Sequence, residues 1–258
     1  MDAALVSCLM IALVGAERDT TLRSNPNFLV CTPSAELAGE LLTAADILRD
    51  ELAEEWLDEK LPPGAGKTHI HLQLSDAKDE GWMWPIDHAD RRAHHVWLVT
   101  DREKGLGCTL AHELSHVVLV TRYPGQIPAW ANEGAACQRD EERSRATRRR
   151  IVESFARSGR WPQLTKLLRA QNISSHDQTS YAAAVSLTDF LIERRDKPTL
   201  IRFAVAGQRG GWDAALREHY QIKNVAALQS AWQRWTRRPA SLASAIGRSS
   251  PSSQGSRR

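Results

Sequence analysis

The chain has 258 residues, enough for one sizeable domain or for two small ones that share an interface. Its hydrophobic fraction of 42% is ordinary for a globular protein, so a buried core is feasible. The formal net charge is +3, but residues 237–258 hold five arginines and no acid, which leaves −2 (+3 less 5) for the rest. A basic nucleic-acid-binding surface is therefore not indicated, and we expect no nucleic-acid partner.

The N-terminus is an apolar run that ends in Val14-Gly15-Ala16, which is typical of a signal peptide with a small-residue cleavage site. We interpret residues 1–16 as such a signal and the polar residues 17–27 as a linker. The run is too short to span a bilayer as a helix. It departs from a typical signal peptide in one respect, because its first residues include Asp2 and no Lys or Arg. A buried N-terminal helix or strand is the alternative. Cleavage would make the protein periplasmic or extracellular, and otherwise it is cytoplasmic; no later segment is expected to cross a membrane.

Up to residue 107 the pattern is that of strands with one long helix. Thr68–Leu74 alternates polar and apolar residues strictly, as a half-buried strand does, and Pro85 restricts its own segment to the edge of a sheet. His69 and His71 lie on the polar face of that strand, where we interpret them as solvated and not as metal ligands. We expect strands at Phe28–Cys31, Thr68–Leu74, Gly81–Pro85 and His95–Val99, a helix at Ala35–Leu57 capped near Ser34, and a turn at Asp101–Gly107.

Beyond residue 107 the pattern is helical nearly throughout. We expect helices at Cys108–Thr121, at Ala131–Ser158 (one or two), and at Trp161–Ala170, Ser180–Arg194, Thr199–Ala206, Trp212–Tyr220 and Val225–Thr236. Residues 139–150 are dense in both charge signs and indicate a solvated helix face, and residues 237–258 indicate a disordered basic tail. The sequence thus predicts an α+β protein: a small N-terminal α/β lobe with a mixed sheet, and then a mainly helical lobe.

One segment at the junction of these lobes combines residues that bind metals. His112, Glu113 and His116 form an H-E-x-x-H pattern inside an apolar helix, and this pattern is a known signature of the metal-binding helix of zinc peptidases. Residues four apart on a helix share one face, so both imidazoles can reach one zinc ion, while Glu113 flanks it and contacts bound water. Burying two histidines and a glutamate inside a helix costs folding free energy unless these groups have a partner, and a metal ion would be such a partner.

A catalytic zinc usually has a third protein ligand besides water. A third histidine six residues after His116 is excluded, because that residue is Arg122. Glu133 lies in the apolar stretch 127–136, and the turn at 123–125 allows the second helix to face the first. We therefore predict a single zinc ion per chain, held by His112, His116 and Glu133.

These two stretches, His-Glu-Leu-Ser-His-Val-Val-Leu and Ile-Pro-Ala-Trp-Ala-Asn-Glu-Gly-Ala, resemble the gluzincin peptidases of the peptidase-MA-like type. The resemblance extends from about residue 25 to 235, and we assign residues 28–236 to a domain of this kind. It implies a thermolysin-like core, in which an edge strand of the sheet aligns an extended peptide or protein substrate. It also implies that Glu113 is the general base of a peptidase.

The same resemblance implies a Tyr or His that stabilises the oxyanion, for which Tyr181 is the candidate and His176 the substitute. Some members of the family carry an Asp one turn after the ligand Glu, but here that residue is Cys137. If the two helices pack as expected, Cys137 comes near Cys108, and a disulfide between them is conceivable. A domain that binds zinc or a partner without turnover is the alternative function, and nucleic-acid binding through residues 148–150 and the tail is a weaker one.

Overall fold

The computed structural model describes residues 20–87, 92–174 and 176–238. The chain divides into two compact units. The first runs to Ile127 and adds Ala135–Glu142, and the second comprises Pro128–Gly134 and the chain from Arg143 onward. The expected signal peptide and nearly all of the expected basic tail lie outside the described residues, so those two predictions stay untested.

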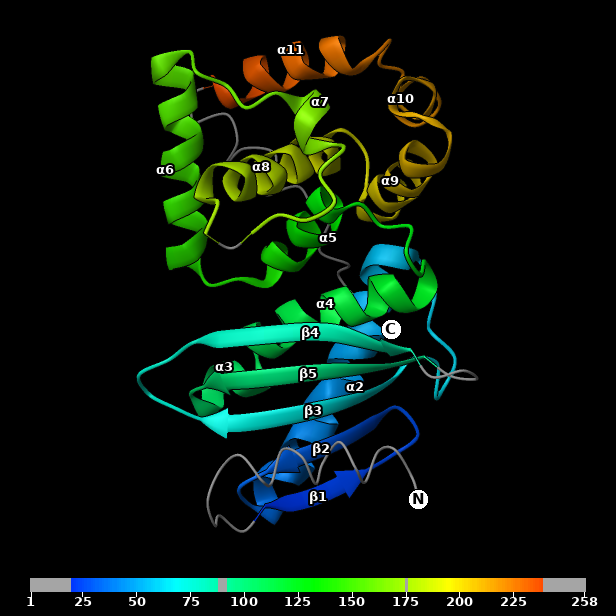
Figure 1. The fold of residues 1–258 in the computed structure, drawn as a ribbon, viewed down its shortest axis with the longest axis vertical. Helices are drawn as coiled ribbons and strands as arrows, with labels where there is room; N and C mark the ends of the chain where they lie inside the picture. Colours follow the sequence, from blue (N-terminus) through cyan, green and yellow to red (C-terminus); the bar gives the residue numbers. More distant parts are fainter. Residues whose placement is uncertain (1–19, 88–91, 175, 239–258) are drawn as a thin grey trace, which may run out of the picture. The chain divides into compact units, whose positions relative to one another are not determined.

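The first unit is built on a five-stranded mixed sheet with the strand order β1-β2-β3-β5-β4 (Figure 1). The inner strands β2, β3 and β5 are parallel to one another, and β1 and β4 run antiparallel at the two edges. The expected α+β class is therefore confirmed. The strands are β1 Thr21–Ser24, β2 Phe28–Thr32, β3 Lys67–Leu74, β4 Glu80–Asp87 and β5 Arg92–Thr100.

Two helices, α2 (Ala35–Leu57) and α4 (Cys108–Arg122), cover one face of this sheet (Figure 1). Helix α2 begins where the Ser34 side chain accepts a hydrogen bond from the backbone N–H of Leu37, and it connects the parallel strands β2 and β3. The sheet contributes alternate apolar side chains to this core, as the alternation in β3 predicts. The fully buried ones are Phe28, Val30, Ile70, Leu72, Val96 and Leu98.

The opposite face of the sheet carries a cluster of aromatic rings. His71 stacks on Trp97 with ring centroids 3.8 Å apart, and Trp84 stacks on His95 at 5.6 Å. Burial lowers the pKa of His71, so this ring is neutral near pH 7. Among the described residues, neither of the two groups that could hold a metal ion includes His71 or His69. Both side chains are half-buried, so the interpretation of these histidines as solvated is wrong.

A polar cluster holds the start of α4 against the sheet. One carboxylate oxygen of Asp79 accepts hydrogen bonds from the hydroxyls of Thr100 (2.9 Å) and Thr109 (2.8 Å), and Lys104 pairs with the other oxygen at 3.1 Å. Burial raises the pKa of Asp79, but the two hydroxyl donors and Lys104 together outweigh it, so this pKa lies below its usual value. The cluster therefore fixes where the helix with His112 begins.

The second unit, in the described part of the chain, is formed by helices. They are α5 Ala129–Ala136, which crosses from the second unit into the first, then α6 Glu142–Ser158, α7 Leu164–Leu167, α8 Gln178–Arg194, α9 Lys197–Gly210, α10 Trp212–Tyr220 and α11 Val225–Thr236. Helix α8 is buried along most of its length, and it contacts α9 and α11. Trp130 of α5 packs against Phe203 and Trp212, which ties the start of α5 to this helical core. No helix in the described residues is long and apolar enough to cross a membrane.

The structure corrects five details of the sequence predictions. Part of the expected linker forms β1, the expected turn after β5 contains the short helix α3 (Arg102–Leu106), and the helix expected at 161–170 is reduced to α7. The conceivable disulfide between Cys108 and Cys137 is wrong, because both are free thiols. The solvated face expected at 139–150 is correct for most of α6, but not for residues 139–140, which lie in and just after a short 3-10 helix, η1 (Cys137–Arg139).

Candidate metal centre

Helix α4 presents His112 and His116 one turn apart on the same side. Their ring centroids are 5.1 Å apart and the rings are nearly perpendicular, at 77°. Glu113 and His116 are only 5% and 7% exposed, and His112 is half-buried. The helix is anchored by its apolar residues Leu110, Leu114 and Val118, which are buried in the core, so its three polar side chains are held on a rigid element.

The carboxylate of Glu113 lies directly against the backbone of the edge strand β4. A Cβ atom added to Gly81 would lie 2.6 Å from Oε1 of Glu113 and 3.0 Å from its Cγ. Only a glycine permits this close approach. The structure therefore places the expected general base beside the edge strand of the sheet.

His112 has a carboxylate partner that the sequence interpretation missed. The Nδ1 atom of His112 lies 2.7 Å from Oδ1 of Asp140, and both side chains are about one-sixth exposed, at 17% and 16%. When Nδ1–H donates to this carboxylate, the lone pair of Nε2 is left for a metal ion. This is the arrangement that orients metal-binding histidines in many proteins.

Asp140 follows η1, two helical turns after Glu133, whereas the sequence interpretation considered only the position one turn after Glu133. That position is Cys137, which is fully buried and a free thiol. His112, Cys137 and Asp140 also form a group that could hold a metal ion, with ligand atoms within 4.8 Å of one another. Asp140 thus gives His112 a carboxylate partner, although Cys137 stands at the position where some family members carry an Asp.

In the second unit, Glu133 on α5 is contacted by Tyr181 on α8. The Tyr181 hydroxyl donates a hydrogen bond of 2.6 Å to Oε2 of Glu133. The guanidinium of Arg148 lies over the Tyr181 ring, with its Cζ 5.9 Å from the ring centroid. His176, the substitute candidate, is exposed, and its backbone N–H bonds to the Ser174 hydroxyl. Of the two oxyanion candidates, Tyr181 is therefore the one in contact with an expected metal ligand.

His112, His116 and Glu133 form a group that could hold a metal ion, since their ligand atoms all lie within 4.8 Å of one another. Two imidazole nitrogens and one carboxylate oxygen are a donor set that suits zinc and leaves a position for water. The buried Nδ1 of His116 has no hydrogen-bond partner among the described residues. Buried polar atoms normally have a partner, so this nitrogen indicates that a further group binds at the site. The residues present therefore fit a zinc ion.

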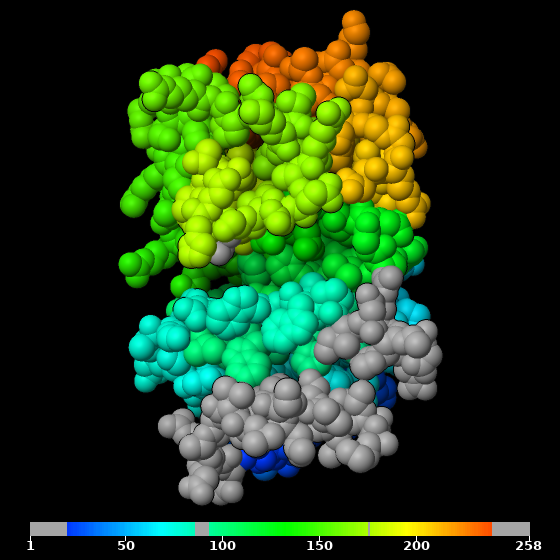
Figure 2. Space-filling view, viewed as in Figure 1, coloured from blue at the N-terminus to red at the C-terminus, as the bar shows by residue number. Residues whose placement is uncertain are grey.

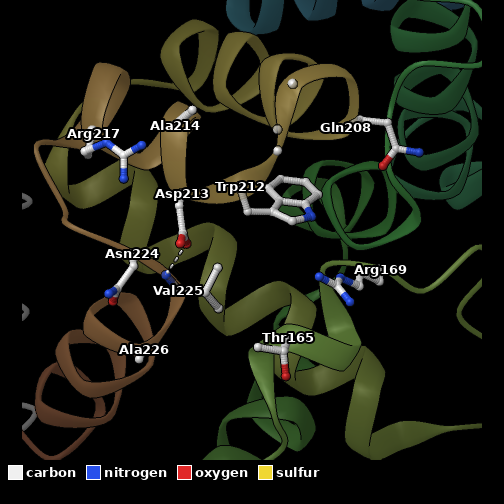
Figure 3. A pocket seen from close by; sticks show the side chains of 13 residues that line it. Thr165, Arg169, Gln208, Trp212, Asp213, Ala214, Arg217, Asn224, Val225 and Ala226 are labelled. Carbon is white, nitrogen blue, oxygen red and sulfur yellow. Dashed lines mark hydrogen bonds between the residues drawn. The ribbon is translucent and has the colours of Figure 1, made fainter.

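A separate cavity of about 780 Å³ lies in the second unit, around Trp212 (Figure 3). Two of its polar side chains have structural partners: Asp213 accepts from the backbone N–H of Val225 at 2.9 Å, and Arg217 donates to the Lys223 carbonyl at 3.2 Å. None of the expected site residues lines it. We therefore assign it no role in the chemistry.

No protein-family model matches the chain, and no significant similarity to a curated protein or to a solved structure is found. The function is therefore inferred from the residues of the site and from their geometry.

Proposed function

We propose that this protein is a zinc-dependent peptidase of the gluzincin type, which hydrolyses peptide bonds in a peptide or protein substrate. The observation that carries the proposal is the position of Glu113. It lies on the same helix as two histidines that could bind zinc, and its carboxylate touches the edge strand along which an extended peptide can be placed. A base, a metal-binding group and a peptide-binding edge are the three parts that this reaction requires.

Zinc held by His112, His116 and Glu133 would lower the pKa of a bound water and polarise the scissile carbonyl. Glu113 would take a proton from the attacking water and deliver it to the leaving amine, as general acid–base catalysis requires. Glu113 is only 5% exposed, so most of its side chain is shielded from bulk water. Tyr181 donates its hydroxyl hydrogen to Glu133 in the structure, and it would turn this O–H to the oxyanion during the reaction.

A zinc-binding domain without turnover, acting in binding or scaffolding, is the second candidate. The sequence favoured this second candidate because Cys137 stands where some family members carry an Asp, whose carboxylate orients a zinc-binding histidine. The contact between Asp140 and His112 weakens that argument, because the orienting carboxylate is supplied from another position. The two candidates differ in whether Glu113 is used.

The test is the hydrolysis of a mixed peptide library by the zinc-loaded wild type and by Glu113→Gln. The proposal predicts cleavage by the wild type, a loss on the order of 10²- to 10⁴-fold in Glu113→Gln, and unchanged zinc content in both. The matched control is Glu103→Gln, a substitution of an exposed glutamate on α3, which leaves the rate unchanged. Zinc binding with no cleavage by the wild type would instead establish the second candidate.

We also propose that the chain is exported, on the basis of the apolar residues 1–16. The intact mass of the protein purified from its native host tests this. A mass that lacks the first 16 or so residues is the predicted result, and a full-length chain in the cytoplasm would contradict it.

A further inference from the structure

The open edge of β4 is interrupted by a proline. Pro85 has no backbone N–H, yet β4 pairs with β5 on both sides of it, through Trp84 with His95 and Ile86 with Ala93. A proline is accommodated inside such a ladder only where its nitrogen points away from the neighbouring strand. The nitrogen of Pro85 therefore points to the open edge, where no strand of the described residues pairs with β4.

This orientation determines which other backbone groups are available at the edge. In an antiparallel ladder, alternate residues direct both their N–H and their C=O to the same side. Gly81 and Met83, four and two residues before Pro85, consequently direct these groups to the open edge as well. The side chains of the same residues point to the face covered by α4, as the contact between Gly81 and Glu113 demonstrates. The surface formed by β4 is visible in cyan in Figure 2.

The aromatic residues of β4 lie on the other face. Trp82 and Trp84 are 48% and 41% exposed, and Trp84 stacks on His95 across the sheet. In a peptide paired with β4, the residues opposite Trp82 and Trp84 direct their side chains to this same face. Alanine at these positions of a test peptide keeps its contacts with the two rings small, so that main-chain contacts are what is compared. What the edge offers such a peptide is two complete pairs of donor and acceptor, at Gly81 and Met83, and then a carbonyl without a donor at Pro85.

We propose that Pro85 limits how many substrate residues before the scissile bond the peptidase binds through main-chain hydrogen bonds. This inference rests on the proposed function. A peptide antiparallel to β4 has the residue directly before the scissile bond opposite Gly81, because that is where Glu113 lies. Its third residue before the bond lies opposite Met83, and its fifth lies opposite Pro85. Main-chain recognition thus includes the third residue and weakens by the fifth.

A series of acetylated peptides tests this, built on a sequence that the wild type cleaves and extended from one to six residues before the scissile bond. Each net main-chain hydrogen bond changes a binding constant by roughly fivefold. The third residue makes two such bonds, so kcat/KM rises on the order of tenfold or more when it is added. N-methylation of that third residue removes most of the gain. The fifth residue can donate to the Pro85 carbonyl but meets no donor there, so its addition raises kcat/KM by only about fivefold, and the fourth and sixth residues change it by less than about threefold.

The variant Pro85→Ala supplies the missing N–H. On addition of the fifth residue, its kcat/KM is expected to rise about fivefold more than that of the wild type, with no change for shorter peptides. The matched control is Trp84→Ala, which alters the neighbouring side chain on the far face and adds no donor at the edge. Thermal unfolding of both variants verifies that the fold is retained.

A gain in wild-type kcat/KM at the fifth residue as large as the gain at the third would overturn the inference while leaving the peptidase function intact. The same holds if Pro85→Ala behaves like Trp84→Ala. If the zinc-loaded wild type cleaves no peptide, the proposed function fails and the inference fails with it, so the two failures are distinguishable.

Discussion

The contact between Asp140 and His112 leads to a quantitative prediction for metal affinity. The substitution Asp140→Asn keeps an oxygen that can accept a hydrogen bond from His112 Nδ1 but removes the negative charge. Asp140→Ala removes both. If Asp140 orients His112 for a metal ion, zinc affinity should decrease in the order wild type, Asp140→Asn, Asp140→Ala.

The size of the effect follows from the geometry. The distance of 2.7 Å is at the short end of charge-assisted hydrogen bonds, and both side chains are mostly shielded from water, with 17% and 16% exposed. A hydrogen bond to a charged group contributes about 1.5–3 kcal/mol. Since about 1.4 kcal/mol is a factor of ten, we expect zinc to bind about tenfold more weakly to Asp140→Asn and up to about a hundredfold more weakly to Asp140→Ala.

Competition with a chelator of known zinc affinity, at fixed pH and ionic strength, measures these constants. The matched control is Glu141→Gln, because Glu141 is the next residue along the chain and pairs with Lys104. This control should bind zinc as the wild type does. Equal affinities for the wild type and Asp140→Ala, or an equal loss in the control, would refute the orienting role of Asp140.

Three further predictions concern other parts of the structure. Gly134→Ala would place a Cβ 2.0 Å from the Thr188 hydroxyl oxygen, so we expect a loss of about 1–3 kcal/mol in the free energy of unfolding by urea, whereas Gly210→Ala, which has open space, should change it by less than about 0.5 kcal/mol. Asp79→Asn should destabilise the protein at pH 7. The folded-state pKa of Asp79 is depressed, so this difference is present above about pH 4 and disappears as the pH falls through that folded pKa; a difference that grows toward low pH would contradict it. Tyr181→Phe should reduce kcat by about 10²-fold with zinc retained, and an unchanged kcat would show that its hydroxyl only buttresses Glu133.

Much of the secondary structure could be predicted from the sequence where a long periodic pattern has clear ends. Helix α2 begins and ends at the predicted residues, because Ser34 caps it and a proline-rich turn follows. Strand β1 could not be predicted, since it has four mostly exposed residues and exists only through its pairing with β2. The five-residue helix α3 is similarly short, and Asp101 at its start is the only local signal.

The candidate site shows the same division between local and long-range information. His112, Glu113 and His116 are recognisable because their spacing is fixed by one helix. Asp140 was missed because its role depends on how the chain folds back after η1, and a charged stretch gives no indication of that. Gly81 was likewise interpreted only as part of a strand, since its contact with Glu113 joins residues far apart in the sequence.

The central claim is that one zinc ion is held by two histidines and a glutamate. Its most direct test is the metal content of the purified wild type, measured by mass spectrometry beside His116→Ala and Glu133→Ala. The account predicts one zinc per chain in the wild type and its loss in both variants. Zinc that persists in Glu133→Ala would contradict the assignment of the third ligand, and a wild type that takes up no zinc, even when refolded with added metal, would contradict the claim as a whole.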